Sequence, residues 1–88
     1  MEANQNLEDL PNIGSTLASL LQEAGINTPA DLYNNGSLQA FIRVKAIDNE
    51  ACFSKLCALE GAVEGIRWHR LSKAKKEELK RFFSMVSR

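Results

Sequence analysis

Three consecutive residues at the start of an expected helix, Gly14, Ser15 and Thr16, could bind an anion. The first backbone N–H groups of a helix have no intrahelical partner, and the helix dipole places partial positive charge there, so these amides can bind a phosphate oxygen. Lys or Arg usually reinforces such a site, but the residues that follow are Ser, Thr and Ala. The carboxylates nearest in sequence would oppose a phosphate: Glu8, Asp9 and Glu23. The pattern favours a structural or protein-binding segment over a DNA clamp.

A basic segment near the C-terminus is the second candidate for nucleic-acid contact. Its cations recur at helical spacing: Lys73, Lys76, Lys80 and Arg81. Glu77 and Glu78 interrupt this positive field, and Glu77 is placed to pair with Arg81 at i, i+4. The spacing therefore favours a solvated helix surface over a nucleic-acid contact.

Trp68 and His69 could form a stacking platform or supply a general base. A tryptophan in a connector more often closes the core with its N–H bonded to a carbonyl, and we expect this of Trp68. His69 has no identifiable partner to orient it for catalysis, so it is expected to be structural.

The two cysteines, Cys52 and Cys57, are five residues apart in an expected helix. Their axial separation of about 7.5 Å and their different faces argue against a disulfide, so both are predicted to act as small hydrophobic residues. The glutamate pairs could hold a cation, but no Asp-rich loop accompanies them, and one histidine without a CxxC pair gives too few zinc ligands. The sequence predicts no catalytic residue, no metal and no cofactor, and an enzyme is not expected.

The elements that would position these residues begin with a tight turn, Leu10-Pro11-Asn12-Ile13-Gly14. Pro11 ends a short helix over 6–10, Asn12 tolerates positive φ, and Ile13 is expected to fill the core. A helix over 15–23 follows, because leucines recur at i, i+3 and i+4, and Gly25 stands where a left-handed cap belongs. This arrangement is typical of a helix-hairpin-helix unit.

The rest of the chain also has helical periodicity. We expect a short helix from Thr28 and Pro29 that stops at 34–36, then helices over 37–46 and 50–64, a connector over 65–71, and a last helix from a Ser72 cap to Val86. The inward face of the last helix is Leu79, Phe82, Phe83 and Val86. No strand-like alternation occurs. The predicted fold is all-α: a single small domain of five or six short helices with a helix-hairpin-helix (SAM/HhH-like) unit.

Size and charge limit the function. Eighty-eight residues with 44% apolar content suit one domain over 1–88, with 1–6 as an expected flexible lead. Eleven basic and eleven acidic residues give no net charge, so no overall electrostatic attraction to nucleic acid or to an anionic membrane is expected. The N-terminus lacks the pattern of a signal peptide, and no apolar run reaches the roughly 20 residues of a membrane span, so a cytoplasmic location is expected.

Several segments together resemble the C-terminal domain of the TfoX/Sxy family of bacterial competence regulators. They are the turn over 10–14, Ala24-Gly25-Ile26 with Ala30-Asp31-Leu32, the stretch from Leu59 to His69, and the closing Leu71 with 76–80. The block Leu-Glu-Gly-Ala with Gly-Ile-Arg-Trp-His is the most specific part. The resemblance implies an all-helical fold and a link to transcriptional control or DNA uptake. Family members often pair this domain with a separate N-terminal domain.

Three functions remain open at this level. The first is a non-enzymatic regulatory module that docks on a protein partner, part of the transcription apparatus or a separately encoded regulator. The alternative is weak nucleic-acid binding, in which the amides of 14–16 contact phosphates with help from the basic residues of 73–81. The third is self-association through leftover apolar surface.

Overall fold

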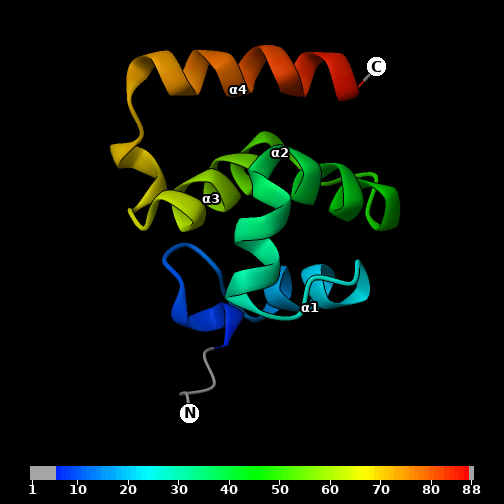
Figure 1. Cartoon of the computed structure of the whole chain (residues 1–88). Coiled ribbons are helices and arrows are strands. Elements are labelled where there is room, and N and C mark those ends of the chain that lie inside the picture. Colours follow the sequence, from blue (N-terminus) through cyan, green and yellow to red (C-terminus); the bar gives the residue numbers. More distant parts are fainter. Residues whose placement is uncertain (1–5, 88) are drawn as a thin grey trace.

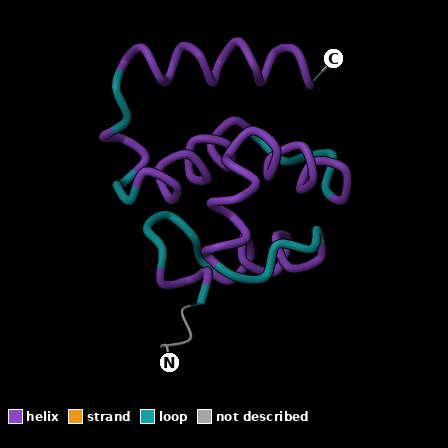
Figure 2. The backbone as a smooth tube through the Cα atoms, in the orientation of Figure 1, coloured by secondary structure: helices purple, strands orange, loops and turns teal. Residues whose placement is uncertain are grey.

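In a computed structural model, which describes residues 6–87, the chain forms four α-helices and two short 3-10 helices, and no strand occurs within that range (Figures 1 and 2). The elements are η1 (Leu7–Asp9), α1 (Ser15–Glu23), α2 (Pro29–Ile47), α3 (Phe53–Glu64), η2 (Trp68–Arg70) and α4 (Lys73–Val86). The all-helical prediction is confirmed. The flexible lead expected over 1–6 lies outside the described residues except for Asn6, whose N–H donates to Asp9 Oδ2 at 2.9 Å.

The chain turns sharply between η1 and α1, as the sequence predicts. The Ile13 N–H donates to the Leu10 carbonyl at 3.4 Å, and Asn12 has φ 72°. Proline followed by a residue with positive φ is the signature of a type II turn. Ile13 is 5% exposed and fills the core as expected. The element before the turn is a 3-10 helix of three residues, which is shorter than the helix predicted over 6–10.

A glycine-containing cap ends α1. Gly25 has φ 88°, its N–H donates to the Gln22 carbonyl at 3.0 Å, and the Ile26 N–H donates to the Leu21 carbonyl at 2.8 Å. These two bonds form a Schellman motif, which returns the apolar Ile26 to the core beside Leu21. Both side chains are fully buried.

Helix α2 combines two segments that the sequence predicts as separate helices. Thr28 caps its start, since Thr28 Oγ1 accepts from the Asp31 N–H at 3.1 Å, and Pro29 occupies the first turn. Gly36 interrupts the helix with φ 79° and ψ 163°, a conformation that favours glycine. The chain then continues helically to Ile47, so α2 consists of two helical segments that meet at a kink, and the predicted break at 34–36 is confirmed at Gly36.

Helix α3 begins later than predicted. The Ala51 and Glu50 N–H groups bond to Asp48, at its carbonyl and its Oδ1, so residues 48–51 form a turn. The first helical residue is therefore Phe53 rather than Glu50. Beyond it, α3 is buried on most sides, which confirms the prediction of a nearly encircled central helix.

In Figure 1, η1 and α1 lie at the bottom, the first half of α2 rises from them, the second half of α2 and α3 lie in the middle, and α4 runs across the top. Helix α4 packs on α3, and α1 packs on α2. Leu79, on the inward face of α4, is fully buried. The ring of Phe83 lies 5.9 Å from that of Phe41 and 5.7 Å from that of Phe53, so α4 meets α2 and α3 through an aromatic cluster.

Hydropathy adds one observation. None of the helices described over 6–87 combines the length and the apolar character that crossing a membrane would require.

Candidate functional site

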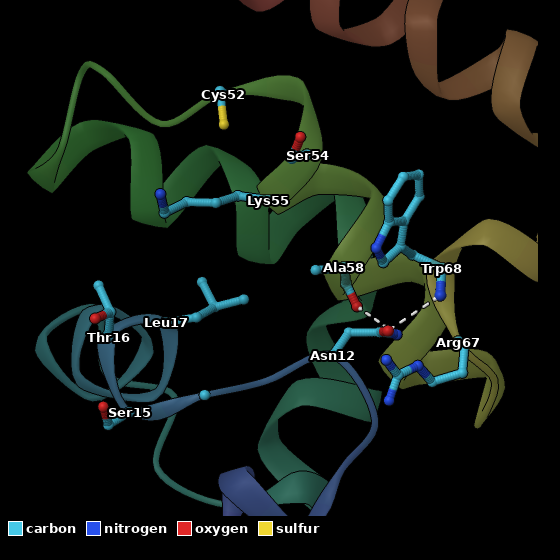
Figure 3. A pocket seen from close by; sticks show the side chains of 11 residues that line it. Asn12, Ser15, Thr16, Leu17, Cys52, Ser54, Lys55, Ala58, Arg67 and Trp68 are labelled. Atoms are coloured by element: carbon cyan, nitrogen blue, oxygen red, sulfur yellow. Dashed lines mark hydrogen bonds between the residues drawn. The ribbon is translucent and has the colours of Figure 1, made fainter.

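A hollow lined by described residues, here called the α1–α3 groove, lies between the N-terminal ends of α1 and α3 (Figure 3). Its volume is about 600 Å³. The lining residues come from the hairpin turn, the first turn of each helix and the connector before η2: Asn12, Gly14, Ser15, Thr16, Leu17, Cys52, Ser54, Lys55, Ala58, Arg67 and Trp68. Gly14, Ser15 and Thr16, the predicted anion-binding residues, all lie in it.

The Asn12 side chain holds the two walls of the groove together. Its Nδ2 donates to the Ile66 carbonyl at 2.8 Å and lies 3.5 Å from the Ala58 carbonyl oxygen, while its Oδ1 accepts from the Trp68 N–H at 3.0 Å. Gly61 leaves room for this amide, because a Cβ there would overlap Asn12 Nδ2 and lie 2.7 Å from the Ile66 oxygen. The sequence predicts that Asn12 accepts positive φ, but it does not reveal this link across the fold.

Both helices that begin at the groove start without a side-chain cap. Gly14 precedes α1 and has no side chain, and Cys52 precedes α3 without accepting a hydrogen bond. By contrast, Thr28 and Ser72 accept hydrogen bonds at the starts of α2 and α4. The first amides of α1 and α3 are therefore free of side-chain caps, and two positive dipole ends converge on one hollow.

The charged residues of the lining are Lys55 and Arg67, and the lining contains no Asp or Glu. In Figure 3 they lie on opposite sides of the groove, Lys55 reaching from α3 toward α1 and Arg67 lying beside Asn12. No cation follows the turn in the sequence, but the fold brings these two residues from distant parts of the chain into the same groove.

The acidic neighbours in sequence are placed elsewhere. None of the three carboxylates that the sequence places beside the turn lines the groove. Glu8 borders a smaller hollow of about 200 Å³ on the other side of the first turn of α1, which shares Ser15 with the groove. A phosphate in the groove would therefore be repelled less by Glu8 when it lies near Thr16, Lys55 and Arg67 than when it lies near Ser15.

Sequence comparison identifies the family. The model of the TfoX C-terminal domain matches residues 3–83, which is nearly the whole chain. The chain belongs to this family.

Two solved structures are similar to this chain in sequence and fold. An uncharacterized protein from Listeria monocytogenes, crystallised in a triclinic form, is 54% identical with a TM-score of 0.89, over 91% of this chain and 92% of that one. A protein of unknown function from the same organism, in a tetragonal form, is 52% identical with a TM-score of 0.88, over 90% of this chain and 98% of that one. Among curated proteins, none is significantly similar in sequence.

Trp68 of this TfoX C-terminal domain does not close the core, contrary to prediction. The residue is 42% exposed at the edge of the groove. The connector is held instead through the backbone, since the Trp68 N–H donates to Asn12 Oδ1. His69 is exposed, and its ring lies edge-on to the indole at 5.3 Å.

The two cysteines have different environments. Cys57 is buried, as predicted for a small hydrophobic residue, and burial raises the pKa of its thiol. Cys52 is exposed in the groove, so the prediction is wrong for it, because α3 begins one residue later. The backbone N–H of Lys55, which lies near the sulfur, is the main cause that lowers the pKa of the Cys52 thiol.

The basic residues of α4 are not part of the groove. None of Lys73, Lys76, Lys80 and Arg81 lines it, and α4 and α1 occupy opposite ends of the molecule in Figure 1. Lys76 Nζ donates to the His69 carbonyl at 3.3 Å. The predicted Glu77–Arg81 pair does not form within 4 Å. An exposed ion pair of this spacing stabilises a helix by only about 0.2–0.5 kcal/mol, which is too little to hold both side chains out of water.

A buried carboxylate on α3 joins three helices. Glu60 is 9% exposed, accepts a hydrogen bond from the buried Ser37 hydroxyl of α2, and lies 3.9 Å from Lys75 Nζ of α4. A hydrogen bond with Glu60 raises the pKa of Glu64. The carboxylate of Glu60 thus has its partners within the protein. Within residues 6–87, no three His, Cys, Asp or Glu residues are placed to hold a metal ion.

Proposed function

We propose that this TfoX C-terminal domain is a non-enzymatic regulatory module that binds the phosphate backbone of nucleic acid in the α1–α3 groove. The observation that supports this most directly is the charge of the lining, which contains Lys55 and Arg67 and no carboxylate. The family relates the chain to competence regulators, which is consistent with a regulatory role. The cytoplasm is the location predicted from the sequence.

Three kinds of donor would act together on a phosphate. The first amides of α1 and α3 supply N–H groups at positive dipole ends. The Ser and Thr hydroxyls of the lining supply further donors, and Lys55 and Arg67 supply full charges. In this interpretation the turn over 10–14 serves as the hairpin of a helix-hairpin-helix unit, with η1 as its shortened first helix.

The expected affinity is modest. Non-specific binding to nucleic acid depends on the number of phosphates neutralised, and two cations neutralise about two. The logarithm of the binding constant for duplex DNA should then fall against log salt with a slope of about −1.8. A steep slope would require many more cations than the groove holds.

The test compares two pairs of charge reversals by anisotropy of labelled DNA at low salt. Lys55→Glu with Arg67→Glu should remove measurable binding, because both groove cations become carboxylates. Lys73→Glu with Lys80→Glu is the matched control, with the same change of net charge on exposed positions of α4, and should bind at least half as well as the parent. Loss of binding only in the α4 pair would move the site to α4, and absence of binding in the parent protein would overturn the proposal.

Docking on a protein partner is the second candidate. It is favoured by the end of α4, where Met85 is 67% exposed beside the partly buried Phe82 and Val86. A purified regulator that binds this face should bind Met85→Asp at least tenfold more weakly. Sedimentation of the parent across a concentration range separates this from self-association, for which the partner is a second copy.

A further inference from the structure

Trp68 is the one aromatic residue among those that line the α1–α3 groove. The residue is 42% exposed, although a tryptophan usually buries most of its surface. In Figure 3 the indole stands beside α3 at the edge of the hollow, and the Arg67 side chain extends in the other direction, near Asn12. An exposed ring and two cations that line the same hollow are the combination that binds an unpaired base and its phosphates.

We infer that the groove takes single-stranded nucleic acid, with one unpaired base stacked on the indole of Trp68. The inference rests on the proposed function and names its ligand. Bases in a duplex already stack on their neighbours on both faces, so a side chain at a groove edge can stack only on an unpaired base. The stack would supply affinity that two cations alone do not.

The backbone of Trp68 is already fixed before a ligand arrives. Its N–H is held by Asn12 Oδ1 at 3.0 Å, and its carbonyl accepts from the Leu71 N–H at 3.1 Å. A platform whose backbone is ordered loses less conformational freedom on binding than a loose one. The hydrogen bonds of Asn12 therefore set the position of Trp68 as well as the shape of the groove.

The size of the groove suits this ligand. Its volume of about 600 Å³ lies within the roughly 300–1,000 Å³ of sites that hold a small molecule, so it accommodates a nucleotide or two rather than a long stretch of strand. Lys55 and Arg67 lie on opposite sides of the groove, so each is available to a phosphate of the bound strand. The salt slope for a single strand should then be about −1.4.

The chain's single tryptophan makes the stack directly measurable. We expect a short oligo(dT) to quench the Trp68 fluorescence and to bind more tightly than an abasic oligomer with the same number of phosphates. The difference should be about 5- to 150-fold, the range found when a stacked base is lost. Oligo(U) in a parallel titration distinguishes RNA from DNA as the source of the strand.

The outcomes separate this inference from the proposed function. Equal affinity for oligo(dT) and the abasic oligomer, or tighter binding of duplex, would overturn the stacking while leaving phosphate binding intact. Absence of binding to every one of these polymers would overturn both.

Variants give a second measurement by anisotropy of labelled oligo(dT). Trp68→Ala should weaken binding about 5- to 150-fold, and Trp68→Phe, which retains a ring, should recover part of the loss. Tyr33→Ala removes another exposed aromatic side chain, 49% exposed and outside the groove, and should bind like the parent. Equal loss in Trp68→Ala and Tyr33→Ala would contradict the inference. Circular dichroism of each variant verifies that its helices are intact.

Discussion

The α1–α3 groove and helix α4 both carry basic residues, but these residues have different neighbours. In the groove, Lys55 and Arg67 face no carboxylate of the lining. On α4, Lys75 Nζ bonds to Glu78 Oε1 at 3.2 Å and lies near Glu60, and this hydrogen bond raises the pKa of Lys75. Two unopposed cations therefore mark a stronger candidate for anion binding than a longer run of cations mixed with glutamates.

The helix starts differ in the same way. Ser72 Oγ accepts from the Lys75 N–H at 3.0 Å at the start of α4, whereas α1 and α3 begin without a side-chain cap. A capped start satisfies its own amides, but an uncapped one leaves them for water or a ligand. The α4 side is thus arranged for folding, and the groove end for contact with another molecule.

The largest expected effect tests whether α4 serves the fold. Leu79→Ala removes the fully buried residue of α4 and should lower the free energy of unfolding by about 2–5 kcal/mol in urea titrations. Met85→Ala, on the same helix at a 67% exposed position, should change it by less than about 0.5 kcal/mol. If the folded fraction of Leu79→Ala binds nucleic acid like the parent, the groove does not depend on α4. If Leu79→Ala and Met85→Ala lower the free energy of unfolding by the same amount, the proposed role of α4 in the fold is wrong.

The next effect tests how the groove is held together. In Gly61→Ala, the new methyl group would displace the Asn12 amide and crowd the Ile66 carbonyl, so the free energy of unfolding should fall by about 1–3 kcal/mol. Gly14→Ala is the matched control, because a Cβ there meets nothing within 4 Å, and its cost should stay below about 1 kcal/mol. A stable Gly61→Ala protein with an unchanged Trp68 emission would show that the Asn12 contact is dispensable.

Gly25 and Gly61 show what the sequence can and cannot predict. The turn at 10–14, the Gly25 cap and the Thr28 and Ser72 caps were predictable because each depends on residues within a few positions along the chain. The role of Gly61 was not, since its constraint comes from Asn12, which lies 49 positions earlier in the chain. The sequence places Gly61 within the helix expected over 50–64, but it does not identify the amide that approaches this glycine.

The candidate site divides along the same line. The amides of 14–16 were predictable from local helix-start chemistry, but the cations Lys55 and Arg67 were not, because only the fold brings α3 and the connector to the start of α1. Trp68 was assigned to the core on residue type alone. Its exposure follows from the Asn12 hydrogen bond, which secures the connector without burying the indole.

A smaller effect compares the two thiols. Cys52 is exposed in the groove with a lowered pKa, and Cys57 is buried with a raised pKa, so Cys52 should react with iodoacetamide roughly tenfold faster or more. Saturating oligonucleotide should slow the modification, because Cys52 lines the groove. Cys52→Ser identifies the fast phase by its loss. Unprotected modification with bound oligonucleotide would place the ligand elsewhere.

The smallest expected effect concerns pH and belongs to the α3–α4 contact. The hydrogen bond with Glu60 raises the pKa of Glu64 in the folded chain, so between its unfolded and folded values the folded state binds more protons. Stability from this group is full below the unfolded pKa and is lost as pH rises through the folded pKa. Glu64→Gln should flatten this fall in thermal melts taken from acid to neutral pH.

Because Glu64 is exposed, solvent screens its interaction, and the change should be a small shift in slope. Glu77→Gln, an exposed position on α4, removes the same charge away from Glu60 and should retain the parent's slope. If both variants flatten the profile equally, the effect comes from net charge rather than from the Glu60 contact. The groove would not take part in either case, since neither residue lines it. Oligonucleotide affinity measured alongside should therefore stay constant while the melting profile changes.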